Sequence, residues 1–462
     1  MKLTIWGAAE QVTGSMHLLE LEGYKILIDC GLDYERDTWL EENENFPFSP
    51  SQIDVVILTH AHIDHSGNLP TLIRMGFDGQ ILCTPATADL TELLLLDSVT
   101  VFLNRQRKAQ RNKRRASSGP RPLYLQKHVM ETVDRFVTIG FHKPFHLNGL
   151  VSLTFIPVGH LLGAAAAVLT IRENGEEKSI AFSGDIGRKN YPILKDPETL
   201  PQVDYLVCES TYGGRFHTAT QNIEELLTQT VNEACIKNPG RLIIPAFSVG
   251  RTQALVYSLN RIFSKGLLPR VKVFVDSPLA NYATEVFRKH HYLLNQEAQE
   301  FYSAQGDEFE FDNLEYVQDM NASKAISNYF EPCIIISSAG MLEGGRIQDH
   351  LYDNIQNYYC SILFIGYCAK NTLGYRLLRG DPIVTIRNRE LSVYATIQKT
   401  DLFSGHGDHR DLVNFVKQQD PDKLKKVFLV HGEISSMQKL QEALEEENFN
   451  TVVPQKGKTY LL

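Results

Sequence analysis

Residues 55–65 read VVILTHAHIDH, and this stretch decides the fold. Its first five residues are apolar or β-branched and predict a buried strand. The next six residues contain four potential metal ligands, which are His60, His62, Asp64 and His65. Four such side chains so close together cannot share one face of a strand or a helix. They predict a loop at a strand end that surrounds metal ions, with Zn²⁺ as the expected metal and Mn²⁺ or Fe as alternatives.

Four further strands end in residues of the same kind. Asp29 ends KILID, His160 ends IPVGH, Asp185 ends FSGD and His431 follows FLV. A single histidine at a strand end is more often structural than a ligand. Because strand ends meet at one edge of a sheet, the repeated pattern instead predicts that these side chains gather around one site.

The order of the apparent elements indicates an α/β protein. Residues 1 to about 207 are mostly short strands, with helices expected at 66–76 and at about 86–115. From about 210 to 390, helical stretches alternate with fully apolar strands, which is typical of a parallel sheet. A strand-rich stretch, a helix, a strand and a final helix follow.

Composition excludes several classes of protein. The chain has 462 residues, of which 43% are hydrophobic, so it is not an intrinsically disordered chain. No apolar run reaches the roughly 18 residues of a membrane span, so we expect no membrane association. The seven cysteines are odd in number and mostly lie in apolar runs. They predict buried free thiols and a cytoplasmic location.

Net charge is unevenly distributed. The formal charge is −9 overall, but residues 101–130 contain nine Lys or Arg and no acidic residue. The remaining residues therefore carry −9 − 9 = −18. An acidic average argues against a polyanionic partner, whereas a concentrated basic segment favours one. A solvated helix face is the alternative explanation of this basic run.

The motifs together resemble a known family. The pattern HxHxDH after a strand, with Asp29 before it and His160 and Asp185 after it, resembles the metallo-β-lactamase fold. Glu209 in ESTYGG, His406 in FSGHGDH and His431 in VHGE resemble three motifs of the β-CASP nucleases. IPAFSVGRTQ, DSPLA, SSAGMLEGGR and GYCAKNTLG are also typical of that family, which includes the endonuclease subunit of the cleavage and polyadenylation specificity factor and its bacterial and archaeal homologues. The resemblance covers essentially the entire chain.

The resemblance implies an architecture. We expect an αβ/βα metallo-β-lactamase sandwich with an inserted β-CASP domain that is built on a mainly parallel sheet. The catalytic domain would be discontinuous, comprising residues 1–208 and 391–462. Residues 209–390 would form the β-CASP cap.

It also implies roles for the site residues. One metal would be bound by His60, His62 and His160, and a second by Asp64, His65 and His431. Asp185 would bridge the two ions, and Asp29 would orient a ligating histidine. A hydroxide activated by two Zn²⁺ would attack phosphorus and leave a 5′-phosphate and a 3′-hydroxyl. His406 would be the general acid, with Glu209 holding its ring.

RNA is the substrate that the resemblance favours. The RNA-processing branch of the family has a histidine where the DNA-repair branch has valine, and here that residue is His431. Candidate RNA or phosphate contacts are Ser337, Ser338, Gly340, Arg346, Ser248, Arg251, Arg107, Arg111, Arg114 and Arg115. The serine- and glycine-containing turns could equally be plain strand-to-helix connections. Relatives are often dimers, so a homodimer is possible.

Three alternatives remain at this point. The chain could be a metallo-β-lactamase-fold hydrolase of small thioesters or lactones, a DNA-directed β-CASP nuclease, or an inactive RNA-binding scaffold. The first has no use for Glu209, His406 or a cap of this size, and the last usually lacks ligands that are present here. Endonucleolytic and exonucleolytic cleavage both remain open.

Overall fold

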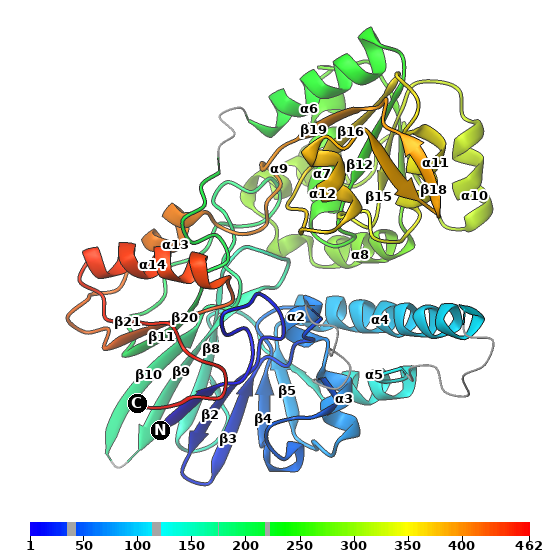
Figure 1. The fold of residues 1–462 in the computed structure, drawn as a ribbon. Helices are drawn as coiled ribbons and strands as arrows, with labels where there is room; N and C mark the ends of the chain where they lie inside the picture. Colours follow the sequence, from blue (N-terminus) through cyan, green and yellow to red (C-terminus); the bar gives the residue numbers. More distant parts are fainter. Residues whose placement is uncertain (35–42, 113–121, 174, 218–221) are drawn as a thin grey trace. The chain divides into compact units, whose positions relative to one another are not determined.

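The computed structural model describes residues 1–34, 43–112, 122–173, 175–217 and 222–462. These residues form two compact units (Figure 1). The first unit contains Met1–Lys189, Lys195–Phe216 and His406–Leu462, and the second contains Asn190–Leu194 and His217–Gly405. The domain limits expected from the sequence, 1–208 with 391–462 and 209–390, stay a prediction.

Two sheets form the first unit. Within the described residues, one sheet has the order β22 (Thr459–Leu461), β1 (Lys2–Ile5), β2 (His17–Leu21), β3 (Tyr24–Ile28), β4 (Val55–Ile57), β5 (Gln80–Cys83) and β6 (Phe136–Thr138). The other has the order β21 (Thr451–Val452), β20 (Lys426–Val430), β11 (Tyr205–Glu209), β10 (Glu176–Phe182), β9 (Ala165–Glu173), β8 (Val151–Pro157) and β7 (Phe145–His146). Because β22 pairs with β1, the two ends of the chain lie side by side (Figure 1).

Successive side chains of the strands point alternately into two apolar layers of this unit. Leu19 on β2 and Ile28 on β3 point into the core between the sheets, where they join Phe155 of β8. Their neighbours Leu18 and Leu27 lie in a separate cluster on the opposite face. Successive side chains of a strand point to opposite faces, so a sheet buried on both sides needs apolar residues at both.

Helices cover the outer faces. The helices of this unit are α2 (Ile63–Ser66), α3 (Leu69–Arg74), α4 (Pro85–Asn112), α5 (Gln126–Val133), α13 (His409–Val416) and α14 (Ile434–Glu446). Leu69 and Leu72 of α3 pack in the outer cluster of the first sheet. On α14 the buried residues Met437, Leu440 and Leu444 recur at helical spacing, and this helix contacts β20 and β21. The arrangement is the expected αβ/βα sandwich.

The second unit contains a parallel sheet. In the described residues its order is β14 (Leu314–Tyr316), β13 (Lys272–Asp276), β15 (Cys333–Ser337), β12 (Arg241–Pro245), β16 (Cys360–Phe364) and β19 (Thr396–Lys399), and all neighbours are parallel. Its helices are α6 (Ile223–Val231), α7 (Arg251–Ser264), α8 (Pro278–Lys289), α9 (Gln296–Gln305), α10 (Met320–Ala325), α11 (Ile347–Asn354) and α12 (Leu373–Arg379). A hairpin of β17 (Ile383–Ile386) and β18 (Arg389–Ser392) completes it.

The central strands of this sheet are buried on both faces, which explains why they are apolar along their length. Leu242, Ile243 and Ile244 of β12 have no exposed surface. Parallel strands are normally covered by helices on both faces, which is why they are continuously apolar rather than alternating.

Two sequence expectations concern the whole chain. All seven cysteines are buried and free, as expected. Among the helices in the described part of the chain, none has the length and apolar character needed to cross a bilayer.

Candidate metal centre and active site

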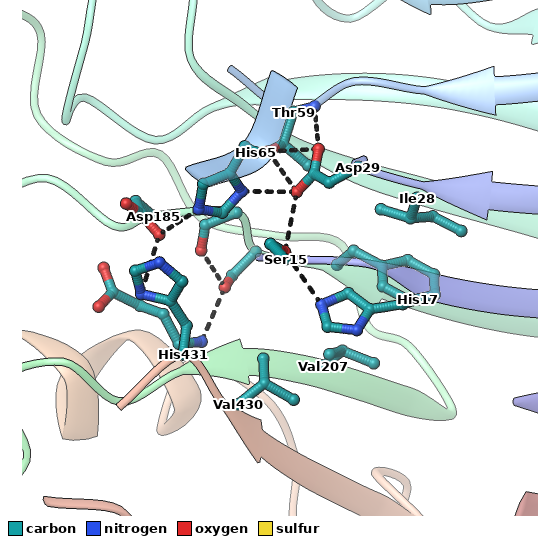
Figure 2. Close-up of a pocket in the computed structure, with 14 residues that line it drawn as sticks. Ser15, His17, Ile28, Asp29, Thr59, His65, Asp185, Val207, Val430 and His431 are labelled. Atoms are coloured by element: carbon teal, nitrogen blue, oxygen red, sulfur yellow. Dashed lines mark hydrogen bonds and ion pairs between the residues drawn. The ribbon is translucent and has the colours of Figure 1, made fainter. Parts of the chain in front are cut away.

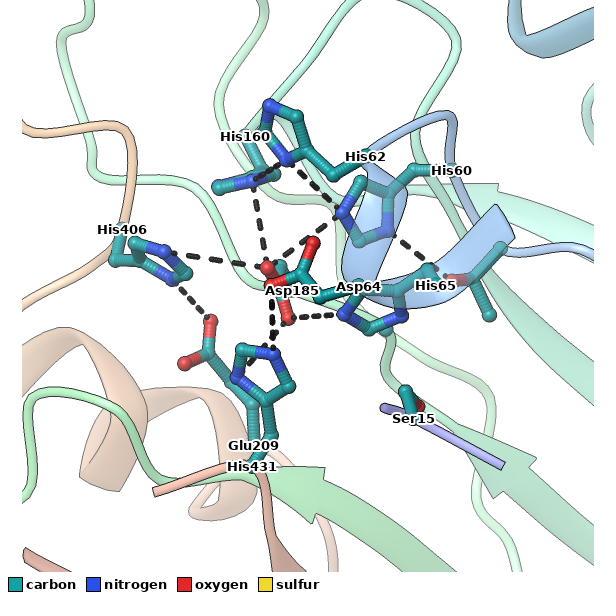
Figure 3. Close-up of polar contacts among 12 residues, drawn as sticks. Ser15, His60, His62, Asp64, His65, His160, Asp185, Glu209, His406 and His431 are labelled. Carbon is teal, nitrogen blue, oxygen red and sulfur yellow. Dashed lines mark hydrogen bonds and ion pairs between the residues drawn. The ribbon is translucent and has the colours of Figure 1, made fainter. Parts of the chain in front are cut away.

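The ligand-type side chains come together at one edge of the sandwich in the first unit (Figure 3). The loop after β4 contributes His60 and His62, and α2 contributes Asp64 and His65. The loops that follow β8, β10 and β20 contribute the other three, which are His160, Asp185 and His431. The structure therefore brings all seven residues proposed as ligands into one place.

Three of the site residues have an unusual backbone conformation, which determines the direction of their side chains. Asp29, His160 and His431 have φ angles of 59°, 28° and 54°. Positive φ costs a residue with a Cβ of the order of 1 kcal/mol or more and persists where surrounding contacts hold it. Here the Asp29 amide donates to Ile57 O at 2.9 Å, and the His431 amide donates to Ala8 O at 2.7 Å. Such strain held in place is typical of functional sites.

The first ligand group consists of three imidazoles and one carboxylate. Nδ1 of His62 lies 3.2 Å from Nε2 of His60 and 3.0 Å from Nε2 of His160. Asp185 Oδ2 lies 3.5 Å from the His60 nitrogen and 3.4 Å from the His160 nitrogen. Burial lowers the pKa of all three histidines, that of His62 to about 3. Neutral imidazole, which is the form that binds metal, is therefore favoured.

The second ligand group lies on the other side of the same carboxylate. Asp185 Oδ1 is 3.3 Å from Nε2 of His65 and 3.5 Å from Nδ1 of His431. Nε2 of His431 is 3.6 Å from Asp64 Oδ2. Burial opposes the ionisation of Asp185, but His431 and His65 hold its pKa well below the usual range. One ionised carboxylate thus presents one oxygen to each group.

Buried polar atoms without hydrogen-bond partners indicate whether metal ions fit this site. Nε2 of His65, Oδ1 of Asp185 and Nε2 of His431 are buried and have no hydrogen-bond partner. Buried polar groups are rarely left without partners, because the loss of hydration costs free energy. A cation between these atoms would satisfy them, and a donor set of imidazole nitrogens and carboxylate oxygens suits Zn²⁺. The residues present therefore fit a metal centre.

Asp29 lies directly behind the second ligand group, as Figure 2 shows. Its Oδ2 is 2.7 Å from Nδ1 of His65. Its Oδ1 accepts from the Thr59 amide at 2.9 Å and from the Thr59 hydroxyl at 3.0 Å. The Asp29 carboxylate can therefore fix the ring of His65 with Nε2 turned toward the centre, and its orienting role stays a prediction.

Glu209 and His406 form a pair beside the two ligand groups (Figure 3). Nδ1 of His406 lies 3.1 Å from Glu209 Oε1, and its Nε2 lies 3.9 Å from Asp185 Oδ2. Glu209 is 1% exposed and accepts from the amides of Ile186 at 2.5 Å and Thr211 at 3.2 Å. The carboxylate is thus fixed by the backbone, and His406 can turn only Nε2 toward the centre.

The predicted phosphate contacts of the second unit lie at the carboxyl ends of its strands. The hydroxyl of Ser277 is 3.1 Å from that of Ser248 and 2.9 Å from that of Ser338. Ser277 was not among the predicted contacts, although it follows β13 inside the DSPLA motif. Gly340 lies two residues after Ser338, and a Cβ at this position would come within 3.3 Å of the Phe247 ring.

Other predicted phosphate contacts already have partners within the unit. The guanidinium of Arg346 donates to Asp276 Oδ1 at 2.6 Å, and the same carboxylate lies 2.7 Å from Nε2 of His350. The hydroxyl of Ser337 donates to Asp276 O at 2.9 Å. The guanidinium of Arg251 stacks on the Phe247 ring at 4.6 Å. These contacts give Arg346 and Ser337 internal roles, and RNA contact by them stays a prediction.

The predicted basic contacts on α4 fall mostly outside the described side chains. Arg107 is exposed on that helix. The side chain of Arg111, and Arg114 and Arg115 as a whole, lie outside the described residues.

Comparisons with known proteins agree with this architecture. Residues 10–234 match the metallo-beta-lactamase superfamily, residues 252–377 match the Beta-Casp domain and residues 390–454 match the Zn-dependent metallo-hydrolase RNA specificity domain. The chain is similar to ribonuclease TTHA0252 of Thermus thermophilus, with 32% identity over 94% of this chain and 93% of the relative.

More distant similarities extend the comparison. Transcription termination factor FttA of Methanosarcina mazei is 30% identical over 94% of this chain and 67% of its own length. Endoribonuclease YSH1 of Kluyveromyces lactis is 28% identical over 95% of this chain and 56% of its own length. A crystal structure of a protein of unknown function from Enterococcus faecalis V583 superposes with a TM-score of 0.57 and 16% identity over 100% of this chain and 99% of that one, which shows the shared fold.

The sandwich, its His- and Asp-lined edge and the inserted α/β unit define a hydrolase of the metallo-β-lactamase fold. The family profiles and the Thermus relative narrow this class, and the chain belongs to the β-CASP metallo-β-lactamase family of ribonucleases. Membership confirms the family and the fold class expected from the sequence. It also supports the coarser part of the expected activity, that of a metal-dependent RNA-cleaving hydrolase.

Proposed function

We propose that this protein hydrolyses RNA phosphodiester bonds with two Zn²⁺ at the centre formed by its first unit, leaving a 5′-phosphate and a 3′-hydroxyl. One observation carries the proposal. Two ligand groups share the Asp185 carboxylate, and a Glu209–His406 pair lies beside them. The first feature suits attack on a phosphodiester by activated water, and the second suits protonation of a leaving alkoxide.

Seven residues would hold the two ions. His60, His62 and His160 would bind one, Asp64, His65 and His431 would bind the other, and Asp185 would contact both. When bound, the ions would lower the pKa of a water nucleophile and offset the charge that grows on the phosphate oxygens. Asp29 would keep His65 in the tautomer that leaves Nε2 free to bind.

The protein's own residues would complete the reaction. Attack of water on phosphorus opposite the ribose 3′-oxygen forms one P–O bond and breaks another. The departing 3′-oxygen would take a proton from Nε2 of His406, since Nδ1 of this ring faces Glu209. The Glu209 carboxylate would hold the ring in place and stabilise its protonated form through the ion pair.

Outside the metal centre, we expect contacts to the phosphate groups of the RNA backbone. The hydroxyls of Ser248, Ser277 and Ser338 are proposed to donate to phosphate oxygens at the carboxyl edge of the second unit's sheet. Parallel α/β sheets commonly bind ligands at this edge. The names of the relatives, a ribonuclease and an endoribonuclease among them, support RNA over a small-molecule substrate. A homodimer and a cytoplasmic location stay predictions.

Cleavage of labelled RNA tests the function. Single-stranded RNA carrying a 5′ or a 3′ label should be cut with Zn²⁺ or Mn²⁺ present and should remain intact after metal removal by a chelator. Mapping both labels would identify the mode of cleavage, and the product ends would reveal the chemistry. No cleavage of RNA together with turnover of a thioester, a lactone or single-stranded DNA would refute the proposal.

A second prediction concerns the basic run. Replacing Arg107, Arg111, Arg114 and Arg115 by glutamine should weaken RNA binding and flatten its salt dependence. For single-stranded nucleic acid, removing one phosphate contact lowers the slope of log K against log salt by about 0.7. Binding titrations at several salt concentrations measure this slope. Replacing four exposed lysines elsewhere provides the control, and an unchanged slope in the arginine variant would mean that the run is a solvated helix face.

A further inference from the structure

A line of buried polar contacts continues from the metal centre into the core of the first unit (Figure 2). Nδ1 of His65 is 2.7 Å from Oδ2 of Asp29. The hydroxyl of Ser15 donates to the same oxygen at 3.4 Å. Nε2 of His17, at the start of β2, lies 3.3 Å from the Ser15 hydroxyl. None of these four residues is more than 3% exposed, so water cannot replace the contacts freely.

The direction of each hydrogen bond follows from what each group can donate. An ionised carboxylate only accepts, so Ser15 uses its single hydroxyl proton on Asp29. The Ser15 oxygen can then only accept from His17, which places the ring proton of His17 on Nε2. On the far side of Asp29, Nδ1 of His65 donates to the carboxylate and leaves its Nε2 lone pair for the metal. All protons along the line therefore point toward Asp29.

The protonation state of His17 agrees with donation from its Nε2 to Ser15. Burial lowers the pKa of His17 to about 4, so the ring is neutral near pH 7 and carries one proton. The other ring nitrogen, Nδ1, is buried and has no hydrogen-bond partner, so the contact with Ser15 is made by Nε2. The ring also stacks on Phe182, with centroids 6.2 Å apart and planes 16° apart, which fixes its orientation.

We propose that Ser15 and His17 are positioning residues that hold Asp29 and, through it, His65 in the geometry that binds the metal ion on the His65 side. The inference rests on the proposed function for the presence of a metal centre. Its physical basis is that groups behind a metal ligand fix the ligand's orientation and tautomer. The Thr59 amide donates to the other oxygen of Asp29, and the Thr59 hydroxyl lies 3.0 Å from both oxygens. Ser15, with His17 behind it, therefore adds to the Thr59 hydroxyl a second contact on the oxygen that faces His65.

The expected effect is moderate. Replacing a group that contacts a ligand directly typically lowers metal affinity about 10–100-fold. Ser15 and His17 are one and two contacts further away, and their hydrogen bonds are long. We therefore expect losses of roughly 3–10-fold for Ser15→Ala and His17→Leu, against a larger loss for Asp29→Asn.

Metal binding by the full-length protein tests the inference without RNA. The wild type and the variants Ser15→Ala, His17→Leu and His17→Gln would be stripped of metal and titrated with Zn²⁺ by calorimetry and with Co²⁺ by visible absorption. Glutamine places an amide donor near the position of Nε2, so His17→Gln should retain most of the affinity that His17→Leu loses. Thr4→Val is the matched control, because it removes a buried hydroxyl from the neighbouring strand β1, where its partner is the Thr459 hydroxyl at 2.8 Å.

The outcomes separate the inference from the proposed function. Weaker binding of one metal equivalent and an altered Co²⁺ spectrum in Ser15→Ala and His17→Leu, with rescue in His17→Gln, would support the inference. Wild-type affinity in both variants would overturn it while leaving the proposed function intact. Equal losses in His17→Leu, His17→Gln and Thr4→Val, in step with their thermal stability, would also overturn it. A wild-type protein that binds neither Zn²⁺ nor Co²⁺ would refute both proposals.

Discussion

Replacing Asp185 by asparagine should reduce RNA cleavage by about 10⁴-fold or more, because loss of metal ions removes both water activation and charge stabilisation, each worth several kcal/mol. Asp185 is the group whose two oxygens reach both ligand groups, at 3.3–3.5 Å from four histidines. An amide is nearly the same shape, but it is uncharged and offers one oxygen in place of two. The variant should therefore lose metal from both groups.

Two measurements check this prediction. Metal content by elemental analysis should fall below that of the wild type, and single-turnover cleavage of labelled RNA gives the loss of rate. Asp422→Asn, on the surface of the same unit, is a control for the chemistry of the substitution and should leave both quantities unchanged. Normal turnover by Asp185→Asn would contradict the bridging role.

Replacing His406 by alanine should lower kcat by about 10²–10⁴-fold, the usual contribution of a general acid, without loss of metal. The structural reason is that Nδ1 of this ring faces Glu209 while Nε2 faces the centre. Glu209→Gln should give a smaller loss, since the ring would keep a hydrogen bond but lose its ion pair.

A modified substrate separates this role from others. An RNA whose scissile 3′-oxygen is replaced by sulfur has a leaving group that needs no proton, so His406→Ala should cleave it almost as fast as the wild type does. The atoms of Asp185, Glu209 and His406 also lie within 4.8 Å of one another, which would allow a metal ion there. If His406→Ala loses metal and the sulfur-containing RNA does not rescue it, His406 is a ligand and the general-acid assignment is wrong.

Much of the fold and the candidate site could be predicted because both depend on local pattern. Alternating and continuous apolar runs indicate which strands are covered on one or both faces. His60 and His65 could be recognised because four ligand-type residues follow one strand within six positions, and so many polar side chains in one loop rarely serve the fold alone. His160, Asp185 and His431 could be joined to them because strand ends meet at one edge.

Residues that hold other site residues in place could not be predicted from the local sequence pattern. Thr59 and Ser15 have ordinary hydroxyl side chains, and nothing in their local pattern distinguishes them from surface serines and threonines. Their importance comes from partners far along the chain, such as Asp29 for Ser15. The internal partner of Arg346 was equally hidden, because its guanidinium donates to Asp276, which lies 70 residues earlier in the chain. Phosphate contact by Arg346 stays a prediction.

The sequence by itself determined the types of element, the α/β class and the set of ligand-type residues, since these follow from periodicity and from side-chain chemistry. Only the tertiary structure decided which oxygen of Asp185 faces which histidines, which nitrogen of His406 is available, and that His17 lies behind the centre. These features depend on the positions of atoms from segments that lie far apart in the chain, such as Ala8 and His431, which are about 420 residues apart. Burial then gives such contacts their strength, because a polar group without water must rely on the partner that the fold supplies.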